Sequence, residues 1–96
     1  MKTKPLTFLL ALTFLFSGSV YGQEEVKKEY WDNGKLKWEE HYKDGKKDGV
    51  ATFWYKNGQV ETESHYKDGK EDGLWTEWSE IGDRIDERHF VDGKEQ

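Results

Sequence analysis

Three histidines recur at an interval of 24 residues, and histidine is the commonest metal ligand among protein side chains. They are His41, His65 and His89. A shared zinc ion would need its ligating nitrogens within about 2.1 Å of one centre. If each histidine lies two strands from the next, their backbones are roughly 10 Å apart, which is too far for such a centre. We therefore expect no metal site. Each histidine should instead pack on an aliphatic residue across the strand pair: Val26, Val50 or Leu74.

Two short segments, "DGKKDG" and "DGKEDG", resemble the beginning of a calcium loop. Their aspartates are Asp44 and Asp48 in the first and Asp68 and Asp72 in the second. An EF-hand loop places an oxygen ligand at its third position and a bidentate glutamate at its twelfth. Here the third position is lysine in both segments, and the twelfth is Tyr55 or Ser79. We therefore interpret the aspartates as turn residues and expect no calcium.

No arrangement of side chains predicts an enzyme. Neighbouring carboxylates occur at Glu39 and Glu40 and again at Glu61 and Glu63, and a glycosidase uses such a pair as acid and base. That chemistry needs a pocket that perturbs a carboxyl pKa, and a small one-layer sheet encloses little. The chain has no cysteine nucleophile, and its serines after residue 22, Ser64 and Ser79, stand in no nucleophile-elbow context.

Residues 1–22 are predicted to be a secretory signal peptide. Lys2 and Lys4 form a basic start, an apolar run of about eleven residues follows, and the segment ends in "SGSVYG". The run is shorter than the ~20 residues of a membrane-spanning helix. Cleavage is expected before Gln23, with cleavage after Ser19 as the alternative. The protein would then be periplasmic, attached to the cell surface or secreted, with no transmembrane segment in the mature chain.

The mature domain, residues 23–96, is expected to be acidic. The chain has 15 Lys and Arg and 20 Asp and Glu, and the signal segment removes only Lys2 and Lys4, which leaves 13 against 20. Nucleic-acid binding draws on a basic excess, so it is not expected. Chains of this size usually need disulfides, metals or association for stability. Since cysteine is absent, something else must stabilise the domain.

The chain repeats itself every 24 residues, with units at about 26–49, 50–73 and 74–96. Each unit carries an Asp-Gly or Asn-Gly turn signal between segments rich in aromatic and β-branched residues. Such dipeptides favour type I′ hairpin turns, in which both central residues have positive φ. The pattern predicts an all-β antiparallel meander of about six strands in a twisted single-layer sheet. The third unit has Ile81 where asparagine is expected, which predicts a longer or bulged turn there.

Pairing the strands across these turns predicts the two faces of the sheet. One face should collect most of the aromatic residues, and an uncovered apolar face of this kind usually marks an interaction surface. The alternative is that the sheet curls on itself and uses these residues as its own small core. The candidate binding residues are Trp31, Trp38, Tyr42, Phe53, Tyr55, Tyr66 and Trp75. Leu36, Ala51 and Val60 are expected on the same face, with Phe53 opposite Leu36 and Tyr55 opposite Val60. The opposite face should hold Val26, Tyr30, Val50, Trp54, Leu74, Trp78 and Ile85, together with polar residues such as Lys37 and Glu61.

The segment "GVATFWYKNGQVETESHYKDGKEDG" at 49–73, with "GLWTEWSEIG" at 73–82, resembles the bacterial MORN repeat variant. The resemblance implies a twisted antiparallel sheet with an aromatic-lined concave side and no catalytic centre or cofactor. This chain departs from the repeat pattern at Ala51, where tryptophan is usual, at Glu25, where glycine is usual, and at the third turn.

These observations predict an exported, non-enzymatic repeat module. It would bind a protein or a glycan, or associate with itself, through the aromatic face. The alternative is an antitoxin or immunity-type protein, because related repeats often carry that label. An exported chain could neutralise a partner only in the cell envelope.

Overall fold

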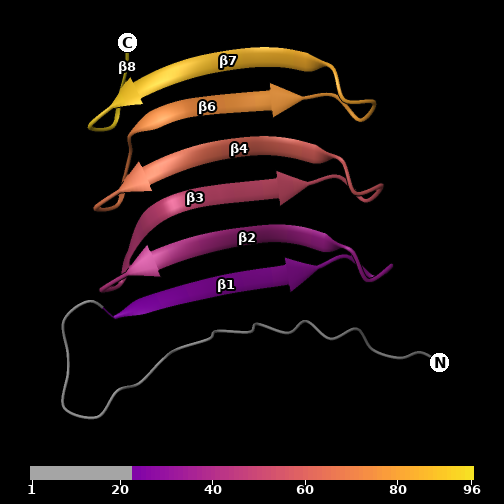
Figure 1. Cartoon of the computed structure of the whole chain (residues 1–96), viewed down its shortest axis with the longest axis horizontal. Coiled ribbons are helices and arrows are strands. Elements are labelled where there is room, and N and C mark those ends of the chain that lie inside the picture. The colour runs from indigo at the N-terminus through magenta and orange to yellow at the C-terminus, as the bar shows by residue number, and fades with distance from the viewer. Residues whose placement is uncertain (1–22) are drawn as a thin grey trace.

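The computed structural model describes residues 23–96, which form one antiparallel sheet in a single layer (Figure 1). Six long strands follow one another across it: β1 (Glu24–Tyr30), β2 (Leu36–Lys43), β3 (Lys46–Trp54), β4 (Val60–Lys67), β6 (Gly73–Trp78) and β7 (Arg84–Val91). Two short strands, β5 (Lys70–Glu71) and β8 (Lys94–Glu95), pair with β4 and β7. The predicted meander of about six strands is thus confirmed, with two short strands added. The predicted signal peptide, residues 1–22, lies outside the described residues. No helix in residues 23–96 is long and apolar enough to cross a membrane.

The Asp-Gly turns have the predicted geometry. Asp44 and Gly45 both adopt positive φ, 52° and 83°. Asp68 and Gly69 follow with 51° and 86°, so the two central residues of each turn lie in the region that a type I′ turn needs. Aspartate tolerates this region better than most side chains, because its short polar group can bond locally to the backbone.

The turns at the other end of the hairpins differ from the prediction. Gly58 has φ 95°, but Asn57 is not in the positive region, so the turn is not type I′. Instead Tyr55 donates its N–H to the Gln59 carbonyl at 2.8 Å, and Gly58 donates to Tyr55 at 3.0 Å, which closes a three-residue loop. The third unit forms the same loop, with Ser79 donating to Asp83 and Gly82 to Ser79. The third turn is thus longer than two residues and bulged, as predicted. The first two loops share this geometry, because the glycine that the loop requires is kept in all three units.

A register shift beside each of these loops moves aliphatic residues to the other face. Glu29 pairs with Trp38, but the next residue, Tyr30, pairs with Leu36. Since paired residues share a face and successive pairs alternate, Leu36 lies on the face opposite to Trp38. The same shift, between Phe53 and Trp54, places Val60 opposite Trp54 rather than Tyr55. The predicted positions of Leu36 and Val60 were therefore wrong, since a bulge inserts one residue that the turn signals do not reveal.

Two other predicted positions are corrected by the same register. Phe53 pairs with Trp38 and not with Leu36, because two residues are inserted near the start of β3. A shift by two residues leaves the alternation intact, so Phe53 keeps its face. Ile85 lies unpaired between Arg84 and Asp86, at the bulge of the third hairpin, and not in the paired row of the opposite face.

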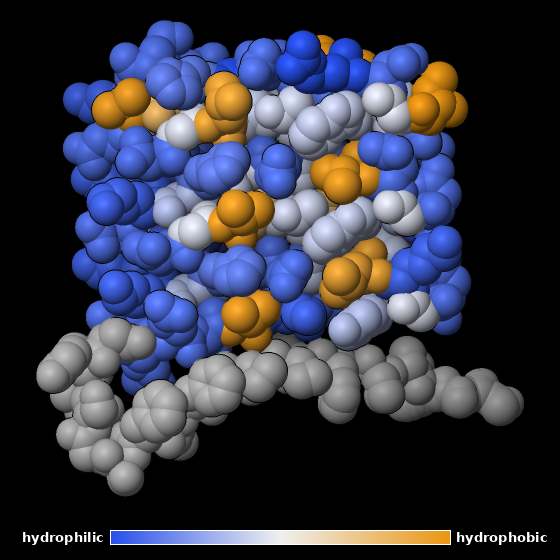
Figure 2. Space-filling view, viewed as in Figure 1, coloured by the Kyte–Doolittle hydropathy of each residue, from blue (hydrophilic) through white to orange (hydrophobic). Residues whose placement is uncertain are grey.

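The sheet has no enclosed core among residues 23–96. Only Ala51, Ser64 and Thr76 are buried, and none of the large side chains is fully buried. In Figure 2 the apolar side chains of the face in view form rows that cross the strands and are bordered by polar side chains. Burial is therefore partial and shared by the two faces.

Hydrogen bonds between successive units compensate for the missing core. The Asn33 side chain donates to the Lys56 carbonyl at 2.9 Å, and Asn57 donates to the Glu80 carbonyl at 3.0 Å. At the Asp-Gly end, Gly69 donates to Lys47 and Gly93 donates to Glu71, both at 2.8 Å. Each unit is thus bonded at both ends to its neighbour, as repeat arrays require when a unit cannot bury its own face.

Two departures from the repeat pattern fall where a neighbouring unit is absent. A Cβ atom on Gly49 or Gly73 would stand 3.3 or 3.2 Å from the Cβ of a histidine on the preceding long strand. No strand precedes β1 in the described residues, so Glu25 needs no glycine. The loop asparagines bond forward to the next loop, and no loop follows the third one in residues 23–96, so Ile81 needs no asparagine. The position of each residue in the array decides which side chain it can carry.

Candidate binding face

The register places the seven predicted aromatic residues on one face, which we call the aromatic face. Trp38 pairs with Phe53, Phe53 with Thr62, and Thr62 with Glu77, which carries this face across four strands. The remaining members follow by alternation along the strands: Tyr42, Tyr66 and Trp75, and, beyond the ends of β1 and β3, Trp31 and Tyr55. Phe90, which pairs with Gly73, belongs to the same face. It was missed, although it stands 24 residues after Tyr66.

Basic side chains lie over several of these rings. The Lys27 ammonium is 4.5 Å from the centre of the Tyr42 ring, and the Lys47 ammonium is 4.8 Å from that of Tyr66. Lys37 and Lys56 lie 4.8 and 5.4 Å from the Trp31 ring. Such contacts are attractive because a cation meets the negative face of the ring. The aromatic face is therefore covered in part by cations, which sequence reasoning did not predict.

The rings are only partly exposed. Phe53 reaches 36% exposure, while the other six predicted members are half-buried. Lys37 stands at the bulge and reaches Trp31, so the residue inserted by the bulge contributes to this face. The bulge could not be seen in the sequence. Lys47 and Arg88, however, are the cross-strand partners of Tyr42 and Trp75, so the correct register would have predicted that both cations lie on the aromatic face.

Glu40 links two of the aromatic residues to a lysine. Its carboxylate accepts the Tyr42 hydroxyl at 3.0 Å and lies 3.3 Å from the Lys47 ammonium. Burial and the bond to Glu40 raise the pKa of Tyr42. Burial lowers the pKa of Lys47, but the charge and hydrogen bond of Glu40, with the two nearby tyrosines, outweigh it and leave that pKa raised. Glu40 therefore holds both partners in their protonated forms.

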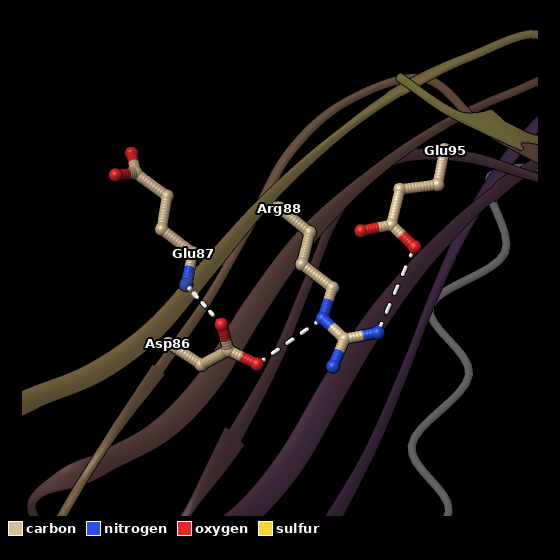
Figure 3. Close-up of polar contacts among 4 residues, drawn as sticks. All are labelled: Asp86, Glu87, Arg88 and Glu95. Atoms are coloured by element: carbon tan, nitrogen blue, oxygen red, sulfur yellow. Dashed lines mark hydrogen bonds and ion pairs between the residues drawn. The ribbon is translucent and has the colours of Figure 1, made fainter.

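Arg88 forms a second charged cluster beside Trp75 (Figure 3). Its guanidinium carbon lies 5.6 Å from the centre of the Trp75 ring. Its Nε donates to Asp86 at 3.1 Å, and its Nη1 lies 3.7 Å from Glu95 of β8. Asp86 also accepts the Glu87 backbone N–H at 2.8 Å. These bonds fix the guanidinium over the ring and attach the short strand β8 to this face.

The polar tips of other rings are also bonded. The Trp38 indole N–H donates to Glu29 at 2.7 Å, and the Trp31 indole N–H donates to the Trp54 carbonyl at 3.2 Å. The Tyr55 hydroxyl donates to the Trp78 carbonyl at 2.7 Å. Burial raises the pKa of Tyr55, and the negative charges of three nearby carboxylates raise it further: Glu61, Glu77 and Glu80. Rings held in this way form a pre-organised contact surface, which lowers the entropic cost of binding.

The histidines lie on the opposite face and pair as predicted. Val26 pairs with His41, Val50 with His65, and Leu74 with His89. The His65 ring nitrogen also lies 3.0 Å from the Leu74 carbonyl. Within residues 23–96 no group of three His, Cys, Asp or Glu side chains could hold a metal ion.

The neighbouring carboxylates are separated by the strand alternation. Glu40 lies on the aromatic face beside Lys47, while Glu39 lies on the other face, 3.7 Å from Lys28. Adjacent residues of a strand point to opposite faces, so Glu39 and Glu40 cannot act on one bond as acid and base. Asp44 and Asp68 occupy the turns described above.

These features define a class of protein: an open, single-layer antiparallel repeat sheet. Residues 26–44 and 47–68 match the model of the MORN repeat variant. The first two units are therefore similar to this repeat, whose family is a non-catalytic module that often mediates protein interactions. Comparison with curated proteins and with solved structures gives no match.

Proposed function

We propose that this chain is an exported, non-enzymatic binding module that recognises a protein, or a glycan, through its aromatic face. The observation that carries the proposal is the aromatic face itself. Seven aromatic side chains share one side of a sheet, and within residues 23–96 no second layer covers them. Aromatic residues supply large contact areas and are enriched in the energetically dominant parts of interfaces.

The charge of the face restricts its partner. Lys27, Lys37, Lys47 and Arg88 lie beside the rings, although the chain as a whole is acidic. A partner that offers apolar groups together with carboxylates would cover the rings and pair with the cations. A glycan would stack on the rings, with its hydroxyls bonded to the same charged groups. Both partners fit a flat surface better than a narrow pocket.

Phe53 and Leu74 offer a matched test of this face. Both are exposed, 36% and 44%, and they lie on opposite faces of the sheet, Phe53 on β3 and Leu74 on β6. Phe53→Glu should reduce capture of envelope proteins and glycans by at least about 10-fold, because it places an unpaired charge in a contact surface. Leu74→Glu should leave capture unchanged. Equal losses in the two variants would contradict the proposal, as would no loss in Phe53→Glu.

Milder changes separate binding from folding. Trp38→Tyr and Trp75→Tyr keep an aromatic ring and should leave the circular dichroism spectrum and the melting curve close to those of the original chain, while capture weakens. His41, His65 and His89 lie on the other face. Changing all three to glutamine, or adding a chelator, should leave capture intact. Capture that survives both tryptophan changes and is lost with the histidines would favour a metal-dependent surface instead.

Export is tested separately. The basic start and the apolar run of residues 1–22 predict cleavage. Mass spectrometry of the native protein should find Gln23 at the N-terminus, or Val20 if cleavage follows Ser19. A cytosolic product that keeps Met1 would contradict export, without affecting the proposal for the aromatic face.

A further inference from the structure

The outer edge of β1 carries a charge pattern that complements itself. β1 reads "EEVKKEY" over Glu24–Tyr30, and no strand of residues 23–96 pairs with the edge that faces away from β2. A free edge presents a row of unpaired N–H and C=O groups, and soluble proteins usually block it or pair it. Figure 1 shows β1 at one end of the stack of strands.

The hydrogen bond between Asp44 and Gln23 shows which backbone groups face outward. The Asp44 N–H donates to the Gln23 carbonyl at 2.9 Å, so the backbone of Gln23 points toward β2. Backbone direction alternates along an antiparallel strand. The backbone groups of Glu24, Val26 and Lys28 therefore point away from β2 and are available to another strand.

We propose that a second copy of this chain pairs with β1 through its own β1, antiparallel, about a two-fold axis at Val26. In this register Glu24 stands opposite Lys28 of the second copy, and Glu25 stands opposite Lys27 of the second copy. The two-fold axis repeats both pairs, and Val26 meets Val26 of the second copy. Four opposite-charge pairs then surround one apolar contact. The outward groups of one strand meet those of the other, which allows about six main-chain hydrogen bonds.

Neighbouring registers are less favourable. A shift of one strand by two residues preserves the faces and the hydrogen-bonding groups. In one direction it brings Glu25 opposite Glu25 of the second copy, and in the other direction it brings Glu25 opposite Glu29. A shift by two more residues in this other direction brings Lys28 opposite Lys28 of the second copy. Like charges directly opposite one another destabilise a strand pair. In the register centred on Val26, four of the five charged residues of β1 stand opposite a charge of the other sign, and the fifth, Glu29, stands opposite the uncharged Gln23 of the second copy.

Pairing of β1 with the edge of β7 is disfavoured for the same reason. If the repeat register seen between β4 and β6 and between β2 and β3 continued into a second copy, Asp86 would face Glu29 and Arg88 would face Lys27. Moreover, Arg88 is already paired with Asp86 and Glu95 inside the chain (Figure 3). On β1, Lys28 lies 3.7 Å from Glu39 and Lys27 lies over the Tyr42 ring, but Glu24 and Glu25 form no ion pair among the described residues. The β1 edge therefore keeps two carboxylates available for a second copy.

The two-fold pairing produces a closed dimer with a continuous sheet. An isologous contact of this kind ends at two copies. The axis is perpendicular to the sheet, so both aromatic faces lie on the same side. This inference rests on the edge of β1 alone and would stand if the aromatic face bound nothing. If the face does bind, the dimer presents it twice and gains avidity on a repetitive partner.

Charge reversal tests the pairing directly. Glu24→Lys with Glu25→Lys gives a basic edge, and Lys27→Glu with Lys28→Glu gives an acidic edge. Sedimentation equilibrium of the purified protein should give twice the chain mass for the original sequence. Each reversed variant alone should dimerise at least about 10-fold more weakly, because every facing pair becomes repulsive. An equimolar mixture of the two variants should recover the dimer, which also shows that both variants fold.

A proline at the axis supplies a second test. Val26→Pro removes an N–H that faces away from β2, and an edge strand tolerates proline at such a position. The variant should keep its β-sheet circular dichroism and lose the dimer. A monomeric original chain at about 100 μM, or a dimer that persists unchanged in both reversed variants, would overturn the proposal.

Discussion

Gly73 and Gly58 both have positive φ, yet alanine should cost far more stability at Gly73 than at Gly58. Gly73 has φ 121°, and a Cβ atom there would stand 3.2 Å from the Cβ of His65, an atom fixed by the backbone of β4. Gly58 has φ 95°, and its Cβ would stand 3.5 Å from the ammonium of Lys35, the flexible end of a long side chain. The two positions thus share backbone strain, but only Gly73 adds a close contact.

The expected magnitudes follow from these two terms. An alanine forced into the positive-φ region costs about 1–2 kcal/mol. Overpacking against atoms that cannot move costs about 1–3 kcal/mol more. Gly58→Ala should therefore destabilise by about 1–2 kcal/mol and Gly73→Ala by about 2–5 kcal/mol. Since a domain of this length has a free energy of unfolding of roughly 4–11 kcal/mol, Gly73→Ala approaches the limit of folding and Gly58→Ala does not.

Urea denaturation, followed by tryptophan fluorescence and circular dichroism, measures the difference. If Gly73→Ala proves too unstable for a complete curve, Gly49→Ala is the substitute, because its Cβ would stand 3.3 Å from the Cβ of His41. Equal destabilisation in Gly58→Ala and Gly73→Ala would refute the close-approach argument. A larger effect at Gly58 would show that the loop, and not the close approach of β6 to β4, limits stability.

Two further predictions concern bonds within the sheet. Asn57→Ala removes the bond to Glu80 and the bond to the Gln59 N–H and should cost about 1 kcal/mol in urea denaturation. Ile81 occupies the equivalent position in the third loop and is 83% exposed. Ile81→Asn should change the free energy of unfolding by less than about 0.5 kcal/mol, because no further loop in residues 23–96 could accept the bond. A stabilisation of about 1 kcal/mol there would contradict the reasoning. The raised pKa values of Tyr42 and Lys47 mean that the folded chain holds these protons more tightly than the unfolded chain. Their contribution to stability is therefore complete below about pH 10 and is lost as pH rises above it. Tyr42→Phe combined with Lys47→Met removes both groups and should make the melting temperature fall less steeply at alkaline pH.

The fold was predictable because the repeat and its turns are local features. Asp44 and Gly45 determine a type I′ turn through residue types that accept positive φ. The alternation of polar and apolar residues then assigns the faces in the middle of each strand, where Trp38, Phe53 and Trp75 lie as predicted. Local chemistry thus sufficed wherever pairing was regular.

The register beside the Asn-Gly loops was not predictable from local chemistry. Asn57 and Gly58 are compatible with a two-residue type I′ turn and with the three-residue loop that forms, since only the glycine needs positive φ in the second case. The bulge that follows inserts one residue, and an odd shift moves a side chain to the other face. This one ambiguity accounts for the misplacement of Leu36 and Val60.

The cations over the aromatic face change what binding requires. Exposed cation–π contacts contribute about 0.5–1 kcal/mol each, so a partner that displaced all five would have to overcome about 3–5 kcal/mol. Each large ring presents 150–250 Å² when fully exposed. Phe53, the most exposed of the seven rings, is 36% exposed. Covering the exposed part of a ring therefore gives at most about 1.5–2 kcal/mol, at about 25 cal/mol per Å², and the sum exceeds that cost only when about four or more rings are covered. A partner that contacts one ring should therefore bind poorly, and one that spans neighbouring strands should bind well. Under the proposed function, the cations would therefore favour extended partners over those that contact a single ring.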